Sequence, residues 1–145
     1  MIRVSKGWFG SIALAWVVVT GVSVWAQAGA APAGPAAVPA EAKKMKAAFA
    51  SSPAAIEAGK PLYAKYCRFC HGNTGAGDST MAPMKPSNLT DTTWTRGSTE
   101  GEIFWVIQNG APPKYDMRGL KGMMTDADTW NLVHHVRSLG GIPKS

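Results

Sequence analysis

The feature that most constrains this 145-residue chain is a pair of cysteines, Cys67 and Cys70, followed at once by His71. They are its only cysteines. A disulfide between them would close a very short loop and add little stability. A thioredoxin-like pair needs alternating strands and helices, and a zinc site needs four ligands, although His134 and His135 exist. Covalent haem attachment uses all three motif residues, because two thiols bond the vinyl groups and the imidazole binds the iron. We therefore expect one covalently bound haem c.

The N-terminal residues have the layout of a secretory signal. Arg3 and Lys6 precede an apolar stretch, residues 8–25, and an Ala-x-Ala cleavage site ends at Ala28. We expect a signal peptide over residues 1–28 and a periplasmic domain. In the alternative interpretation the apolar stretch stays in place as a membrane anchor, since its length is near the lower limit for a span. Both interpretations put the domain outside the cytoplasm.

The charge balance argues against a nucleic-acid ligand. The formal net charge of +6 falls to +4 when Arg3 and Lys6 leave with the signal. The remaining lysines and arginines form no cluster. We therefore expect no nucleic-acid partner, and the weak basic balance merely permits docking to an acidic protein.

The rest of the chain divides into a tether and one small domain. Residues 29–52 are expected to be an Ala/Pro-rich tether, because they lack apolar periodicity over most of their length. Residues 41–50 form at most a marginal short helix, with Met45 and Phe49 as the only large apolar side chains. The domain is expected to occupy residues 53–145.

Capping patterns mark three helices in this domain. Ser52 can cap a helix that begins at Pro53 and leads into the cysteine motif, and Pro61 should kink or split it near Lys60. We find no strand of consequence and no internal repeat. The fold class is therefore all-α and small, with three to four short helices and loops wrapped around the haem, which fills a core that would otherwise be thin.

The other two helices have their own start signals. Ser98 or Thr99 pairs with Glu102 in a capping pattern before an apolar run that stops at an Asn-Gly pair. Thr125 precedes the last helix, whose first turn is acidic and whose last turn contains Arg137, as the helix dipole favours.

From about residue 53 to residue 139 the chain resembles the class I family of c-type cytochromes. AAIEAGKPLYAKYCRFCHGNTGAGD is similar to the family's first helix and haem-binding segment. STEGEIFWVIQNG and TDADTWNLVHHVRSL are similar to its middle and last helices. The resemblance implies a fold in which the first and last helices cross beside the haem.

The resemblance also implies how that crossing packs. Gly59 would allow the close approach, and Tyr63 would pack against Leu132 and the residue at position 135. The family usually has an aromatic residue such as tyrosine there, where this chain has His135. This substitution should weaken the packing.

In this family a methionine from the loop between the middle and last helices is the sixth iron ligand. Met117 fits that place best, and Met123 and Met124 are the alternatives. Met81 and Met84 are expected to pack in the core or at the haem edge. A bis-histidine iron that uses a histidine of the last helix is a further alternative.

Four more positions are carried over from the family. Its loops contain a proline whose carbonyl accepts a hydrogen bond from the axial histidine, for which Pro86 is the candidate and Pro83 the alternative. Leu89 is expected to lie against the porphyrin. Trp94 is expected to donate its indole N–H to a propionate, whose charge Arg96 would offset, and the alternative for both residues is ordinary packing.

The function implied by the resemblance is electron transport. With His71 and Met117 on opposite faces of the haem no iron position is open, so we expect a single-electron carrier and not an enzyme. It would move electrons between a dehydrogenase or respiratory complex and a terminal acceptor, through brief contacts with redox partner proteins. One alternative is a cytochrome c subunit of a larger membrane-associated or periplasmic oxidoreductase complex. Another is a haem enzyme or gas-binding protein with an open sixth site.

Overall fold

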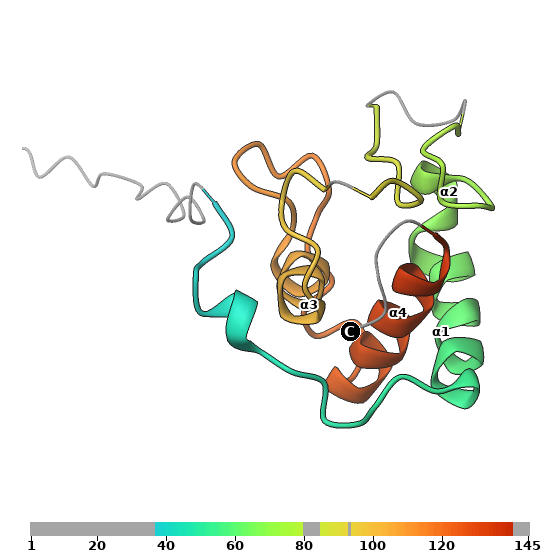
Figure 1. Ribbon diagram of the computed structural model, residues 1–145. Helices are drawn as coiled ribbons and strands as arrows, with labels where there is room; N and C mark the ends of the chain where they lie inside the picture. Colours follow the sequence, from blue (N-terminus) through green and yellow to red (C-terminus); the bar gives the residue numbers. More distant parts are fainter. Residues whose placement is uncertain (1–36, 80–84, 93, 141–145) are drawn as a thin grey trace, which may run out of the picture. The chain divides into compact units, whose positions relative to one another are not determined.

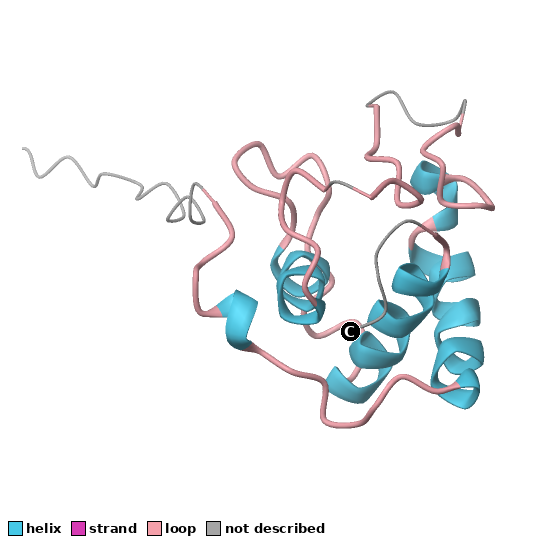
Figure 2. Cartoon of the chain, in the orientation of Figure 1, coloured by secondary structure: helices cyan, strands magenta, loops and turns pink. Residues whose placement is uncertain are grey.

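The computed structural model describes residues 37–79, 85–92 and 94–140, and these residues belong to one unit (Figure 1). A 3-10 helix, η1 (Ala42–Lys44), is followed by α1 (Pro53–Tyr66), α2 (Arg68–His71), α3 (Glu100–Asn109) and α4 (Asp126–Ser138). The described residues contain no strand, only two isolated bridges (Figure 2). The prediction of a small, loop-rich, all-α fold is confirmed.

Several predictions concern residues outside the described ranges. The signal peptide or anchor over residues 1–28 is one of them, and Met81, Pro83 and Met84 are the others. Among the described helices, none combines the length and the apolar character needed to span a bilayer.

Helix α1 begins where its sequence predicts but passes through its internal proline. The Ser52 hydroxyl accepts a hydrogen bond from the Ala55 N–H at 3.1 Å, and Pro53 occupies the first turn. We expected Pro61 to kink or split the helix, yet α1 is one helix across it. Pro61 and Glu57 are both exposed, so water can bond the Glu57 carbonyl that loses its helical partner. The expectation of a split is therefore wrong, and the expected kink stays a prediction.

Helices α3 and α4 both begin in a complete capping box. The Thr99 hydroxyl lies 2.7 Å from the Glu102 carboxylate, and the Thr125 hydroxyl lies 2.7 Å from that of Asp128. Thr99, and not Ser98, is thus the cap of α3. The Ser98 carbonyl instead accepts a hydrogen bond from Arg137 of α4 at 2.7 Å, which joins the start of α3 to the end of α4.

Helices α1 and α4 pack against each other at Gly59, and Figure 1 shows them side by side. A β-carbon added at Gly59 would collide with the Asn131 carbonyl oxygen and lie 2.6 Å from Cβ of His135. The two backbones can approach this closely only because position 59 has no side chain. The close crossing predicted from the sequence is confirmed.

The apolar core lies between α1, α3 and α4. Tyr63 is 3% exposed, and its ring centroid is 5.3 Å from that of His135, at an interplanar angle of 57°. Phe104 and Trp130 stack with centroids 4.1 Å apart. The core cluster is made of nine buried residues, Tyr63, Cys67, Ile103, Phe104, Ile107, Trp130, Leu132, Val133 and Val136.

The N-terminal arm, residues 37–52, lies against the helices. Of residues 41–50, where at most a marginal short helix was predicted, only η1 is helical. Ala42 is fully buried, and a β-carbon at Gly101 of α3 would collide with the Ala42 carbonyl oxygen. The ring centroids of Phe49 and His134 of α4 are 5.6 Å apart. This part of the expected tether is therefore packed.

Replacing His135 with phenylalanine is expected to stabilise the protein. Nδ1 of His135 is buried without a hydrogen-bond partner, and such an atom costs about 1–3 kcal/mol. Burial lowers the pKa of His135 below its ordinary 6.5. A hydrogen bond to the Ile56 carbonyl and the charge of Glu57 raise this pKa, and the charge of Lys60 lowers it. The folded state thus favours the neutral ring. As the pH falls below 6.5, His135 is protonated more readily in the unfolded state than in the folded state, so the protein loses stability.

Urea unfolding of the haem-loaded wild type and His135→Phe, at about pH 8 and about pH 5, measures both effects. We expect a net gain of about 1 kcal/mol at the higher pH, because the phenyl ring keeps the contact with Tyr63 and removes the unpaired Nδ1, which outweighs the lost hydrogen bond to the Ile56 carbonyl. The gain should grow at the lower pH. A gain that is the same at both values would contradict the assigned cost of protonating His135.

Candidate functional site

The cysteine motif forms one helical turn at the end of α1. Cys67 follows α1 and precedes α2, and its carbonyl accepts the His71 N–H at 2.9 Å. Cys67 is 7% exposed and lies in the core cluster, whereas Cys70 is half-buried. No disulfide joins them. The local helix thus places two unbridged thiols and one imidazole within five consecutive residues.

The burial of this turn controls the protonation of two groups. Burial and, to a lesser extent, the neighbouring Cys70 raise the pKa of the Cys67 thiol to about 12. Burial lowers the pKa of His71, while its hydrogen bond to the Ser87 carbonyl acts in the opposite direction. Both effects of burial favour neutral groups. A neutral imidazole is the form that has a lone pair for a metal.

The orientation of His71 is set by a backbone carbonyl. Nδ1 of His71 lies 3.0 Å from the carbonyl oxygen of Ser87. Because a carbonyl only accepts, Nδ1 is the nitrogen that holds the proton, and Nε2 is left as the acceptor. We had expected the carbonyl of Pro86. The Pro86 carbonyl lies against Gly77 instead, since a β-carbon added at Gly77 would lie 2.6 Å from the Pro86 oxygen. The prediction of Pro86 is therefore wrong, and the acceptor is the next residue, Ser87.

Backbone hydrogen bonds hold the two loops that flank His71. The Gly77 N–H donates to the His71 carbonyl at 2.9 Å, and the Leu89 N–H donates to the Gly75 carbonyl at 2.7 Å. The Tyr63 hydroxyl donates to the Gly72 carbonyl at 2.8 Å. Leu89 is half-buried and packs against the core cluster. Its expected contact with the porphyrin remains a prediction.

Trp94 and Arg96 each donate a hydrogen bond to a backbone carbonyl. The Trp94 indole N–H donates to the Asp91 carbonyl at 2.9 Å, within the same turn. Nε of Arg96 donates to the Pro112 carbonyl at 2.8 Å. In the structure an acceptor three residues earlier uses this donor, and the expected bond of the Trp94 N–H to a propionate stays a prediction.

Two of the three candidate methionines lie against the core. Met117 and Met124 are half-buried and pack on the cluster that includes Cys67. Met123 is 59% exposed. Of the two histidines in α4, His134 has its Nδ1 3.9 Å from Oε1 of Glu100, and the ring of His135 packs against that of Tyr63. Burial alone thus sets Met123 apart from the other two, and the choice of Met117 stays a prediction.

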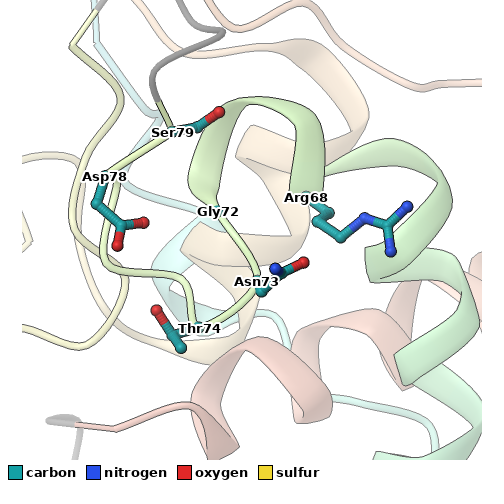
Figure 3. Close-up of a pocket in the computed structure, with 6 residues that line it drawn as sticks. All are labelled: Arg68, Gly72, Asn73, Thr74, Asp78 and Ser79. Atoms are coloured by element: carbon teal, nitrogen blue, oxygen red, sulfur yellow. The ribbon is translucent and has the colours of Figure 1, made fainter.

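A polar pocket lies beside the motif (Figure 3). In the close-up, Asp78 and Thr74 lie on one side and Arg68 lies on the other. The pocket is lined by Arg68, Gly72, Asn73, Thr74, Asp78 and Ser79. Neither thiol nor the His71 imidazole lines it. The pocket is therefore a surface feature of the loop and not the binding site of a group that the two thiols and the imidazole would hold.

Sequence reasoning missed two contacts of this site. The Ser87 carbonyl could not be singled out, because every residue has a carbonyl and its direction depends on the fold. The Tyr63 hydroxyl, bonded to the residue after His71, could have been suspected. A buried tyrosine usually finds a partner for its hydroxyl.

The donors present fit haem c. The motif offers two unbridged thiols for the vinyl groups and an imidazole whose Nδ1–H is already engaged, which leaves Nε2 for the iron. Within the described ranges, histidine, cysteine and acidic residues form no group of three or more that could hold a metal ion.

The chain is similar to subunits of cytochrome oxidases. It is 33% identical over 100 residues to the cbb3-type cytochrome c oxidase subunit CcoP of Rubrivivax gelatinosus, which covers 66% of this chain. It is 34% identical over 91 residues to the subunit FixPc of Rhizobium leguminosarum bv. viciae, which covers 63% of the chain. In both cases the chain spans only 30% of the relative's length.

Solved structures share its fold. A chain of the reducing HAO-like protein complex of Kuenenia stuttgartiensis aligns with a TM-score of 0.57 and 27% identity, over 63% of this chain and 46% of that one. Cytochrome cL of Methylophaga aminisulfidivorans aligns with a TM-score of 0.51 and 24% identity, over 61% and 57% of the two chains.

A family model covers the helices and the motif together. It is described as "Cytochrome C oxidase, cbb3-type, subunit III" and matches residues 54–136, from the first turn of α1 to the last turn of α4. The matched range includes the attachment motif and Met117. This chain therefore belongs to that family of c-type cytochrome domains, whose cofactor is haem c.

Proposed function

We propose that this protein is a periplasmic monohaem cytochrome that transfers single electrons between a dehydrogenase or respiratory complex and a terminal acceptor. One observation carries the proposal. The His71 imidazole is held by the Ser87 carbonyl at 3.0 Å, in the same turn as two unbridged cysteines. This arrangement leaves Nε2 and both thiols for one haem, and the chain has no third cysteine for another attachment motif.

The roles of the residues follow from their chemistry. The thiols of Cys67 and Cys70 would anchor the haem, and His71 and Met117 would be the two protein ligands of its iron. The bound haem supplies an iron that cycles between the ferrous and ferric states. A neutral thioether favours the ferrous state more than a second imidazole does, so the potential should be comparatively high. Two protein ligands leave no open position, which supports a carrier and not an enzyme.

Exposed apolar side chains near the motif support brief protein contacts. Phe69, inside the motif, is 61% exposed, and Met123 is 59% exposed. The Met123 carbonyl accepts a hydrogen bond from Tyr66 at 3.3 Å, which places it beside the residue before Cys67. Exposed apolar side chains of this kind suit a weak redox interface. Redox partner proteins are therefore proposed to dock where these two residues are exposed.

A second candidate is favoured by the relatives. The proteins that the chain resembles are named as cbb3-type oxidase subunits, and the chain spans 30% of their length. This protein would then be the cytochrome subunit of a larger oxidoreductase complex, held to it or to the membrane through residues 8–25. Purification of the native full chain separates the two proposals, since a subunit elutes with its complex and a free carrier elutes alone.

Replacing Met117 with leucine tests the carrier function. We expect the oxidised variant to lose the weak far-red absorption band by which methionine ligation is recognised in this family. Its potential should fall, and the reduced variant should bind carbon monoxide, because leucine fills the space without a ligating sulfur. The wild type should show the band and resist carbon monoxide, as a closed iron requires.

Two matched variants complete this experiment. Met124→Leu changes the other half-buried methionine of the same loop, and Met123→Leu changes the exposed one. Both should keep the band and the resistance to carbon monoxide. A wild type that binds carbon monoxide freely would refute the carrier and point to the gas-binding or enzymatic alternative. Loss of the band in Met124→Leu alone would transfer the ligand role to that residue.

A further inference from the structure

The loop after α3 turns back along the end of the helix. The Ala111 N–H donates to the Met117 carbonyl at 2.9 Å, which closes the loop at its base. The Leu120 N–H then donates to the Ile107 carbonyl at 2.8 Å, and the Lys121 N–H donates to the Gln108 carbonyl at 3.0 Å. These two carbonyls belong to the last turn of α3, where backbone carbonyls have no hydrogen-bond partner within the helix. The return segment, residues 118–121, is thus fastened to the helix end.

A glycine allows this contact. A β-carbon added at Gly119 would collide with the Gln108 carbonyl oxygen and lie 2.6 Å from the carbonyl carbon of Asn109. It would also lie 2.9 Å from Cα of Asn109. All three atoms are backbone atoms of α3, which cannot rotate away as the end of a side chain can. Any larger residue at position 119 must therefore lift the return segment from the helix.

The same loop is fastened again on its far side. Beyond Gly119 the chain makes a turn in which the Met123 N–H donates to the Leu120 carbonyl at 2.9 Å. The Met123 carbonyl then accepts the Tyr66 hydroxyl at the end of α1. The loop is therefore held between the end of α3 and the residue that precedes Cys67. Met117 lies two residues before Gly119, where the loop backbone contacts the backbone of α3.

We infer that Gly119 is a positioning residue for the sixth iron ligand. By letting the return segment lie flat on the end of α3, it fixes the backbone of Met117, and with it the reach of the thioether toward the haem bound at Cys67 and Cys70. This inference deepens the proposed function and rests on its assignment of Met117. Gly119 would thus act through the backbone of Met117 and not as a ligand itself.

Gly119→Ala tests the inference in the haem-loaded full chain. Imidazole is the probe, because it competes with the thioether for the sixth position and its binding is seen in the absorption spectrum. We expect imidazole to bind about tenfold more tightly to Gly119→Ala than to the wild type, the size of change that a forced overpacking contact produces. The far-red band should weaken and the reduction potential should fall.

Gly101→Ala is the matched control. Position 101 is equally filled, since an added β-carbon would lie 2.6 Å from Cβ of Met45, but it is at the opposite end of α3. This variant should lose stability without a change in imidazole affinity. Equal tightening of imidazole binding in both variants, or no tightening in Gly119→Ala, would overturn the inference. If Gly119→Ala does not accumulate with haem, Lys121→Pro removes the N–H bonded to Gln108 and should give the same tightening.

Met117→Leu separates this inference from the proposed function. If that variant keeps the far-red band, the ligand assignment fails and the role of Gly119 fails with it. If it loses the band while Gly119→Ala binds imidazole as the wild type does, only the positioning role is wrong.

Discussion

Gly59→Ala is expected to destabilise the haem-loaded protein by about 2 kcal/mol, even though alanine is the better helix former. The added methyl group would collide with the Asn131 carbonyl oxygen and lie 2.7 Å from its carbon. Both atoms belong to the backbone of α4, so relief requires the whole helix to move. The packing between α1 and α4 would then loosen around Tyr63 and Cys67, both of which lie in the core cluster.

Urea unfolding followed by circular dichroism measures this loss, and Ala58→Gly is its control. Ala58 is exposed in the same helix, so its replacement should cost about 1 kcal/mol through helix propensity alone. The two substitutions exchange the same pair of residues in opposite directions. If propensity governed both sites, Gly59→Ala would raise stability. A rise would contradict the close crossing of α1 and α4.

The helices were readable from the sequence because their signals are local. Ser52, Thr99 and Thr125 each cap a helix through atoms only three residues away. The same is true of the attachment motif, whose donors occupy a single turn. Gly59 was identified through the family resemblance, which supplied the partner helix that the residue alone cannot reveal.

The sequence was less informative where a contact joins distant segments. The acceptor of the His71 Nδ1–H is 16 residues away, and the choice between the neighbouring carbonyls of Pro86 and Ser87 depends on how that loop turns. Such an acceptor has no sequence pattern, because it is a backbone carbonyl and every residue has one.

The N-terminal arm shows the same limit from the side of packing. Its composition suggested a tether, and Ala42 has too small a side chain to indicate burial by itself. The arm is held because Gly101 leaves room for the Ala42 carbonyl and Met45. The apolar ring of Phe49 also finds His134. A segment with little periodicity can thus pack when the complementary surface lies elsewhere in the chain.

Removing both thiols is expected to abolish covalent haem attachment. Each cysteine contributes one thioether bond, so Cys67→Ser with Cys70→Ser leaves His71 as the only link that the motif provides, and a coordination bond does not survive denaturation. After expression with haem-attachment machinery, the wild type should keep its haem on a denaturing gel and have the mass of the polypeptide plus one haem. The double variant should release all of it.

The single variants and a control complete the argument. Cys67→Ser and Cys70→Ser should each keep a thioether through the remaining thiol, and Phe69→Ala should keep both, since that exposed ring lies inside the motif but supplies no bond. A wild-type mass of the polypeptide less two hydrogens, without haem, would reveal a disulfide and refute the assignment. Cys67 is 7% exposed, and its burial raises the pKa of the thiol to about 12. The same burial puts Cys67 in the core, where a covalently held haem can complete the packing of α1, α3 and α4.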